Sequence, residues 1–167
     1  KDMNLVYQSD IKDMYVDENN AYLSSMVVGK DGKLIASSNN VIYVIGADGT
    51  PEKSIPTNAD YINRLFATED GRVFFTKYSN MGPGMEMIEV DTEKYTLGEA
   101  LKDLPNMNGN VKAGPEGKLL MPGDKYLYEY DLETGVATPI LDWLDSYVTA
   151  DFITDYKPLD NGDFILY

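Results

Sequence analysis

A short turn sequence, Asp31-Gly32-Lys33-Leu34, returns at Asp70-Gly71-Arg72-Val73, at Glu116-Gly117-Lys118-Leu119 and, in looser form, at Asn161-Gly162-Asp163-Phe164. The glycines stand at positions 32, 71, 117 and 162, so the intervals are 39, 46 and 45 residues. An acid-glycine pair between apolar runs is a strong hairpin signal, because glycine adopts positive φ at little cost. The repeat therefore predicts hairpins at a nearly regular spacing.

Alternating apolar segments flank each turn. One segment precedes each turn and one follows it. In the first three repeats a third segment comes next, with its centre at Tyr43, Ile88 and Tyr128, which lie 11, 17 and 11 residues after the turn glycine. The expected strands are 25–28, 34–37 and 41–45; then 62–67, 73–76 and 85–90; then 110–113, 119–121, 126–130 and 136–140; and finally 150–155 and 164–167. Two short helices are conceivable, at 98–104 and 141–146, but neither is long enough to organise a fold.

Four-stranded antiparallel meanders of about 40–46 residues are typical of β-propeller blades. The expected units are 1–20 (half a blade), 21–60, 61–106, 107–146 and 147–167 (half a blade). The alternative is a β-sandwich or barrel with evenly spaced turns. The two half blades could close a four-bladed ring; otherwise the chain is part of a larger propeller, whose open strand edges would favour self-association.

The amino-acid composition excludes or disfavours several classes of function. The 167 residues carry a net charge of −14 and include no His and no Cys. Nucleic-acid binding and docking on anionic membranes need basic clusters, so both are disfavoured. Triads based on Ser-His or Cys-His, disulfides and zinc sites with His or Cys ligands are excluded. The longest apolar runs are strand-sized, far too short to span a membrane.

Residues 130–146 read Tyr-Asp-Leu-Glu-Thr-Gly-Val-Ala-Thr-Pro-Ile-Leu-Asp-Trp-Leu-Asp-Ser. This text resembles the propeller region that precedes the solute-binding domain in some large bacterial extracellular solute-binding lipoproteins. The resemblance is best over about the last 60 residues. It implies a bacterial extracellular or surface-anchored protein working beside a sugar transporter. In that family the two-lobed solute-binding domain carries the ligand site, so no binding residue is carried over to this chain.

The leading expectation is thus a non-catalytic binding or scaffold module linked to sugar capture. Exposed aromatic rings beside polar groups suit sugars, and the candidate ligand residues are Asp142, Trp143, Asp145 and Tyr147. The alternative for Trp143 is a plug between two blades. A Gly/Pro-rich extension carries Met81, Met85 and Met87, which are candidate contacts for a protein partner because methionine adapts to varied surfaces; otherwise it lies flat over the rim.

Two further chemistries stay open. A carbohydrate-active enzyme would need paired carboxylates, such as Asp151 with Asp155 or Asp142 with Asp145, at a separation that suits glycoside chemistry. No cofactor is expected, although calcium could bind the oxygen-rich segments 17–20 and 160–163. The competing interpretation in both cases is that these acids cap turns in solvent.

Overall fold

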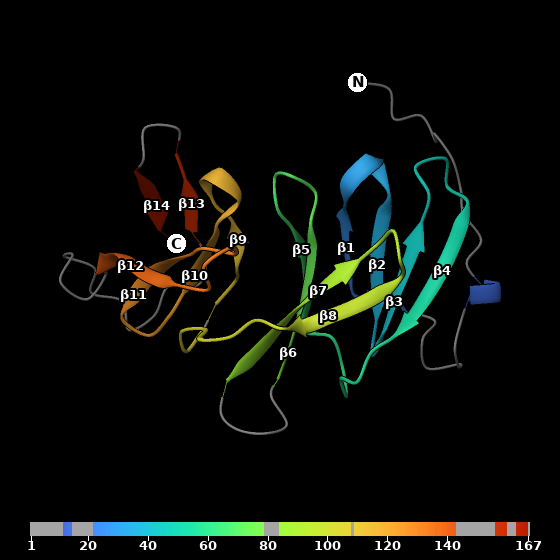
Figure 1. Cartoon of the computed structure of the whole chain (residues 1–167), viewed down its shortest axis with the longest axis horizontal. Helices are drawn as coiled ribbons and strands as arrows, with labels where there is room; N and C mark the ends of the chain where they lie inside the picture. The colour runs from blue at the N-terminus through green and yellow to red at the C-terminus, as the bar shows by residue number, and fades with distance from the viewer. Residues whose placement is uncertain are drawn as a thin grey trace. The chain divides into compact units, whose positions relative to one another are not determined.

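Strands make up nearly all of the regular secondary structure in the described part of the chain (Figure 1). The computed structural model describes residues 12–14, 22–78, 84–107, 109–142, 156–159 and 163–166. The chain divides into two compact units, Lys1–Ala100 and Leu101–Tyr167. Within the described ranges, Lys12–Met14 forms a single 3-10 turn, and the short turns Lys30–Gly32 and Pro115–Gly117 contain residues with non-helical backbone angles.

The first unit holds two four-stranded antiparallel meanders (Figure 1). One has the order β1-β2-β3-β4 and the other the order β5-β6-β7-β8. Their strands are β1 (Ser25–Val28), β2 (Leu34–Ser38), β3 (Val41–Ile45) and β4 (Pro51–Pro56), followed by β5 (Arg64–Ala67), β6 (Val73–Tyr78), β7 (Met85–Asp91) and β8 (Thr96–Ala100).

The second unit holds a third meander and a hairpin. The meander has β9 to β12 in sequence order, and β13 pairs with β14. Their bounds are β9 (Lys112–Ala113), β10 (Leu119–Pro122), β11 (Tyr126–Tyr130), β12 (Ala137–Asp142), β13 (Tyr156–Pro158) and β14 (Phe164–Leu166). Its core includes Leu120, Leu127 and Tyr156, and the Tyr156 hydroxyl donates to the Leu120 carbonyl at 2.7 Å.

The three meanders confirm the strand pattern expected from the sequence, with most ends within two residues. The helix expected over 98–104 is wrong, because 98–100 belong to β8, where Ala100 pairs with Ile88 of β7. A helix of one or two turns is marginal alone, and Gly98 weakens it further, so pairing with β7 prevails. Of the second helix, 141–142 extend β12, and 143–146 lie outside the described residues, as does the strand expected over 150–155.

The repeated turns have the backbone that their glycines predict. Asp31 and Gly32 have φ of 59° and 75°, and Glu116 and Gly117 have φ of 54° and 73°. Two successive positive φ angles at the central residues of a turn indicate type I′, and each turn is closed by a backbone hydrogen bond, from the Lys33 N–H to the Lys30 carbonyl and from the Lys118 N–H to the Pro115 carbonyl. The second copy differs: Gly71 has φ of 81°, and its N–H donates to the Thr68 carbonyl at 3.0 Å. The same turn sequence therefore adopts two different hairpin conformations.

An apolar cluster and a hydrogen bond between the turns join the two meanders of the first unit. The apolar cluster takes Ile42 and Val44 from one sheet and Leu65 and Phe75 from the other, all almost completely buried. At the turns, the Lys30 N–H donates to the Gly71 carbonyl at 3.0 Å. The first and second copies of the turn sequence are therefore in direct backbone contact.

Proline marks the outer strands of two sheets. β4 is last in the order β1-β2-β3-β4, and it begins at Pro51 and ends at Pro56. β12 lies at one end of its sheet and contains Pro139. Proline has no N–H for a strand ladder, so these positions suit an edge. No helix in the described part of the chain is long and apolar enough to cross a membrane.

Candidate binding site

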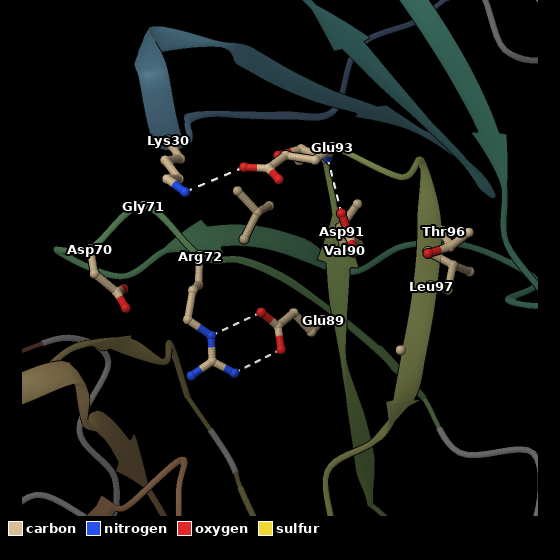
Figure 2. Close-up of a pocket in the computed structure, with 13 residues that line it drawn as sticks. Lys30, Asp70, Gly71, Arg72, Glu89, Val90, Asp91, Glu93, Thr96 and Leu97 are labelled. Carbon is tan, nitrogen blue, oxygen red and sulfur yellow. Dashed lines mark hydrogen bonds and ion pairs between the residues drawn. The ribbon is translucent and has the colours of Figure 1, made fainter.

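An open pocket of about 400 Å³ lies in the first unit, beside the second copy of the turn (Figure 2). Its wall combines the 68–72 turn, the adjoining parts of β7 and β8, and Lys30 from the preceding turn. Charged side chains, including Arg72, Glu89 and Glu93, share the lining with apolar Val90 and Leu97. The volume falls within the range of about 300–1,000 Å³ that is typical of small-molecule sites.

The pocket contains a bidentate ion pair between Arg72 and Glu89. Arg72 Nε donates to Glu89 Oε1 at 2.8 Å, and Arg72 Nη2 donates to Glu89 Oε2 at 2.7 Å (Figure 2). The guanidinium carbon also lies 5.2 Å from the centroid of the Phe74 ring. Two parallel hydrogen bonds and a ring face fix the plane of the guanidinium. The pocket thus presents a rigid polar group rather than a mobile charge.

The same ion pair recurs one repeat later. Lys118 follows Gly117 as Arg72 follows Gly71, and its Nζ lies 2.7 Å from Glu129 Oε1. Glu89 and Glu129 each immediately follow the centre of the third strand, Ile88 and Tyr128. In the first meander Val44 holds that position, and Lys33 instead pairs with Glu52 of β4 at 2.8 Å. The basic residue of the turn sequence therefore binds a glutamate in all three meanders, a role that sequence reasoning missed.

The far wall of the pocket is a turn fixed by a carboxylate. Asp91 Oδ1 accepts the backbone N–H groups of Glu93 at 3.0 Å and Lys94 at 2.8 Å. Lys30 Nζ lies 3.3 Å from Glu93 Oε1 across the opening (Figure 2). Asp131 makes the same pair of turn hydrogen bonds in the second unit. These aspartates act as turn caps, the role weighed against catalysis from the sequence.

The two aspartates that line this pocket have lowered pKa values. The Thr68 hydroxyl, its closest partner, lowers the pKa of Asp70. The backbone N–H of Lys94 is the largest cause that lowers the pKa of Asp91. Both carboxylates therefore stay ionised at neutral pH. A glycosidase acid needs a carboxyl group whose pKa is raised, and these two are shifted in the opposite direction.

Of the four residues expected to bind a ligand, only Asp142 lies among the described residues. Asp142 ends β12, and its carboxylate lies 3.2 Å from Lys125 Nζ. Trp143, Asp145 and Tyr147 lie outside the described residues, as do Asp151 and Asp155. Calcium stays a prediction, since 17–20 and 160–162 also lie outside them; over the ranges that are described, no cluster of three or more acidic residues could hold a metal ion.

The methionines separate into different environments. Met85 begins β7 and is partly buried, and its sulfur accepts the Asn63 side-chain N–H at 3.5 Å. Met87 is completely buried opposite Thr76, so it leaves the set of partner contacts. Met85 and Met87 are two residues apart and lie on the same face of β7, but Met87 pairs with Thr76, which is buried, whereas Met85 pairs with the exposed Tyr78 at the strand end. Met81 lies outside the described residues.

The aspartate turns predict a specific response to acid. Their pKa values are lowered on folding, from an unfolded value of about 3.9, so the stability they contribute is present above that value. It is lost as the pH falls through the folded pKa. We expect the melting temperature to fall below about pH 4, and Asp91→Asn to lower it at neutral pH while weakening the acid dependence. Circular dichroism melts from below pH 4 to neutral pH measure both melting temperatures. Asp60→Asn, on an exposed loop, is the control. Equal pH profiles for Asp91→Asn and the wild type would contradict the prediction.

Comparisons with known proteins identify the fold. No family model and no curated protein matches the sequence. Among solved structures, the chain is similar to the WD40 β-propeller domain of Doa1, with a TM-score of 0.59 and 18% identity over 88% of this chain and 48% of that one.

Two Bacteroides structures are similar as well. One is an extracellular domain described as part of a hybrid two-component system of B. thetaiotaomicron, with a TM-score of 0.59 and 11% identity over 91% of this chain and 22% of that one. The other is an auxiliary nutrient binding protein from B. ovatus, with a TM-score of 0.51 and 13% identity over 75% of this chain and 35% of that one. This chain spans less than half the length of each of the three. Together with its three four-stranded meanders, these likenesses show that the chain has the β-propeller fold.

Proposed function

We propose that this chain is a non-catalytic binding module of a bacterial extracellular protein for nutrient capture, and that its pocket binds a neutral, hydroxyl-rich ligand such as a sugar. The observation that carries the proposal is the fixed Arg72–Glu89 pair in an open pocket of about 400 Å³. A rigid ion pair offers donors and acceptors at set positions, and this favours recognition over a chemical step.

The ligand class follows from the lining. Charged side chains can donate to and accept from neighbouring hydroxyls, while the partly buried Leu97 supplies apolar contact for the carbon atoms of a sugar. The net charge of −14 disfavours acidic ligands. The lowered pKa of Asp70 and of Asp91 leaves neither as a proton donor at neutral pH.

Two observations support the proposed cellular setting: the similar solved structures and the resemblance of residues 130–146 to a known family. A nutrient binding protein and an extracellular domain are among the similar structures. The sequence of 130–146 resembles the propeller region of solute-binding lipoproteins. We infer that the parent protein acts at the cell surface beside a sugar transporter, with this propeller as an accessory binding module.

A titration with a matched pair of variants tests the pocket. Arg72→Met and Lys118→Met each remove the basic partner of a cross-strand glutamate, but only the first lies in the pocket. The probes are maltoheptaose, xylohexaose and mannohexaose, followed by calorimetry and by amide NMR of the full chain. We expect Arg72→Met to weaken binding about tenfold or more, by loss of charged hydrogen bonds worth roughly 1.5–3 kcal/mol, and Lys118→Met to leave it unchanged.

Three results would argue against the pocket. They are an absence of shifts at Gly71 and Arg72 with every probe, equal effects of the two variants, and release of new reducing ends. The last would favour the carbohydrate-active enzyme instead. Both variants should lose similar, small stability, because ion pairs that remain partly exposed to solvent contribute about 0–1 kcal/mol. A large loss in Arg72→Met alone would show that its effect on binding is structural.

A further inference from the structure

A second surface stands at the far end of β6 from Arg72. Tyr78 is the last residue of that strand, and Tyr61 lies in the connection between β4 and β5. Their ring centroids are 6.0 Å apart and the ring planes are tilted by 54°. Tyr61 is 47% exposed and Tyr78 is 56% exposed. Among the aromatic pairs in the described part of the chain, this is the one in which both rings are so exposed.

The scaffold holds this pair in place from both sides. The backbone N–H of Ile62 donates to the Asn39 carbonyl, and that of Asn63 donates to the Thr76 carbonyl at 2.8 Å. Tyr78 pairs with Met85 across β6 and β7. These hydrogen bonds hold the backbone that carries the two rings, and a tyrosine has only two χ angles to restrict, so little conformational entropy is lost when a ligand binds.

Polar groups lie beside the rings. Asn63 Nδ2 donates to Met85 Sδ at 3.5 Å. A thioether is a weak acceptor, so a ligand hydroxyl can replace it at small cost. Burial and the neighbouring Tyr78 raise the pKa of Tyr61 above its ordinary value, which is itself well above neutral pH, so the hydroxyl is a donor there. The surface therefore combines apolar ring faces with an amide and a phenol at their edge.

We propose that Tyr61, Tyr78 and Asn63 form a second binding site, which stacks a pyranose ring of a neutral saccharide. The carbon-bound hydrogens of a sugar ring lie against an aromatic face, while its equatorial hydroxyls point outward to polar groups. With the planes tilted by 54°, one tyrosine lies under the sugar and the other meets its edge. A proline-rich peptide needs an aromatic-lined groove, and a single tilted pair with a polar edge fits it less well.

This site is separate from the pocket, because neither tyrosine lines that cavity. It shares with the proposed function only the ligand class. A saccharide long enough to have several rings can therefore bind at Tyr61 and Tyr78 whether or not Arg72 contributes.

The experiment uses the full chain with the same three oligosaccharides and a proline decapeptide as the rival probe. Tyr61→Ala and Tyr78→Ala should each weaken saccharide binding about tenfold. Tyr61→Phe and Tyr78→Phe keep the rings and should stay within about threefold, consistent with loss of one neutral hydrogen bond. Tyr22→Ala removes a tyrosine that is 83% exposed elsewhere and is the control, with no change expected.

The outcomes distinguish this site from the pocket. Amide shifts at Asn63 and Tyr78 that disappear in the alanine variants and persist in Arg72→Met support the second site. Shifts confined to Gly71 and Arg72, or alanine variants that bind like wild type, overturn it and leave the pocket standing. No shifts with any saccharide overturn both proposals. Shifts at Tyr78 with the decapeptide alone would overturn the saccharide assignment in favour of a protein-binding surface.

Discussion

Replacing Gly71 with alanine should destabilise the first unit by about 3 kcal/mol, since a strained φ and forced overpacking each cost roughly 1–3 kcal/mol. Gly71 has φ of +81°, and an added Cβ would lie 2.7 Å from both the Cα and the backbone nitrogen of Lys30. Backbone atoms cannot rotate out of the way, so the two turns must separate. Separation also breaks the hydrogen bond from the Lys30 N–H to the Gly71 carbonyl.

Gly117→Ala isolates the contribution of the contact. Gly117 occupies the matching place in the turn sequence with φ of +73°, yet a Cβ added there would meet no heavy atom within 4 Å. We expect it to cost only about 1 kcal/mol, the cost of the conformation alone. Urea unfolding followed by circular dichroism measures both. Equal losses for the two variants would mean that the approach of the two turns contributes nothing to stability.

Phe75→Ala should cost about 3–5 kcal/mol, the range for truncating a buried aromatic side chain. Phe75 is completely buried in the apolar cluster that includes residues of both meanders, such as Ile42 and Leu65. Removing the ring leaves a cavity that two paired sheets cannot collapse to fill. Hydrogen exchange should then show faster opening in β2 and β3 as well as in β6, because the cluster belongs to both sheets.

Val28→Ala is the control for this core substitution. Val28 is 62% exposed on β1, and an exposed substitution usually changes stability by about 0.5 kcal/mol or less. A loss below about 1 kcal/mol for Phe75→Ala would show that the sheets repack freely. Faster exchange confined to β5–β8 would show that the two meanders open independently.

Local signals predicted the hairpins well. The type I′ turns at 31–32 and 116–117 depend on the conformational preference of glycine and on the residues next to it, all of which are visible in the sequence. The strands followed because alternation and spacing repeat with the turns. The helix expected over 98–104 failed because what decides that segment is pairing with β7, a partner the local pattern does not include.

The pocket could not be predicted in the same way. Its ionic groups come from Lys30, Arg72 and Glu89, which lie in three separate segments of the chain. A usable signal did exist: a glutamate follows the centre of the third strand at 89 and at 129, paired with a basic residue after the turn glycine. The exposed pair of Tyr61 and Tyr78 gave no such signal, since a loop and a strand end bring it together.

The prolines of the outer strands bear on how the protein behaves at high concentration. Fibrils grow when a chain adds, hydrogen bond by hydrogen bond, to an exposed ladder on another molecule. Three edge positions have no amide proton that could bond to an added strand. They are Pro51 and Pro56 on β4 and Pro139 on β12. Glu52 and Lys53 add exposed charge between the first two. We therefore expect these two edges to resist cross-β templating in concentrated solutions of the chain.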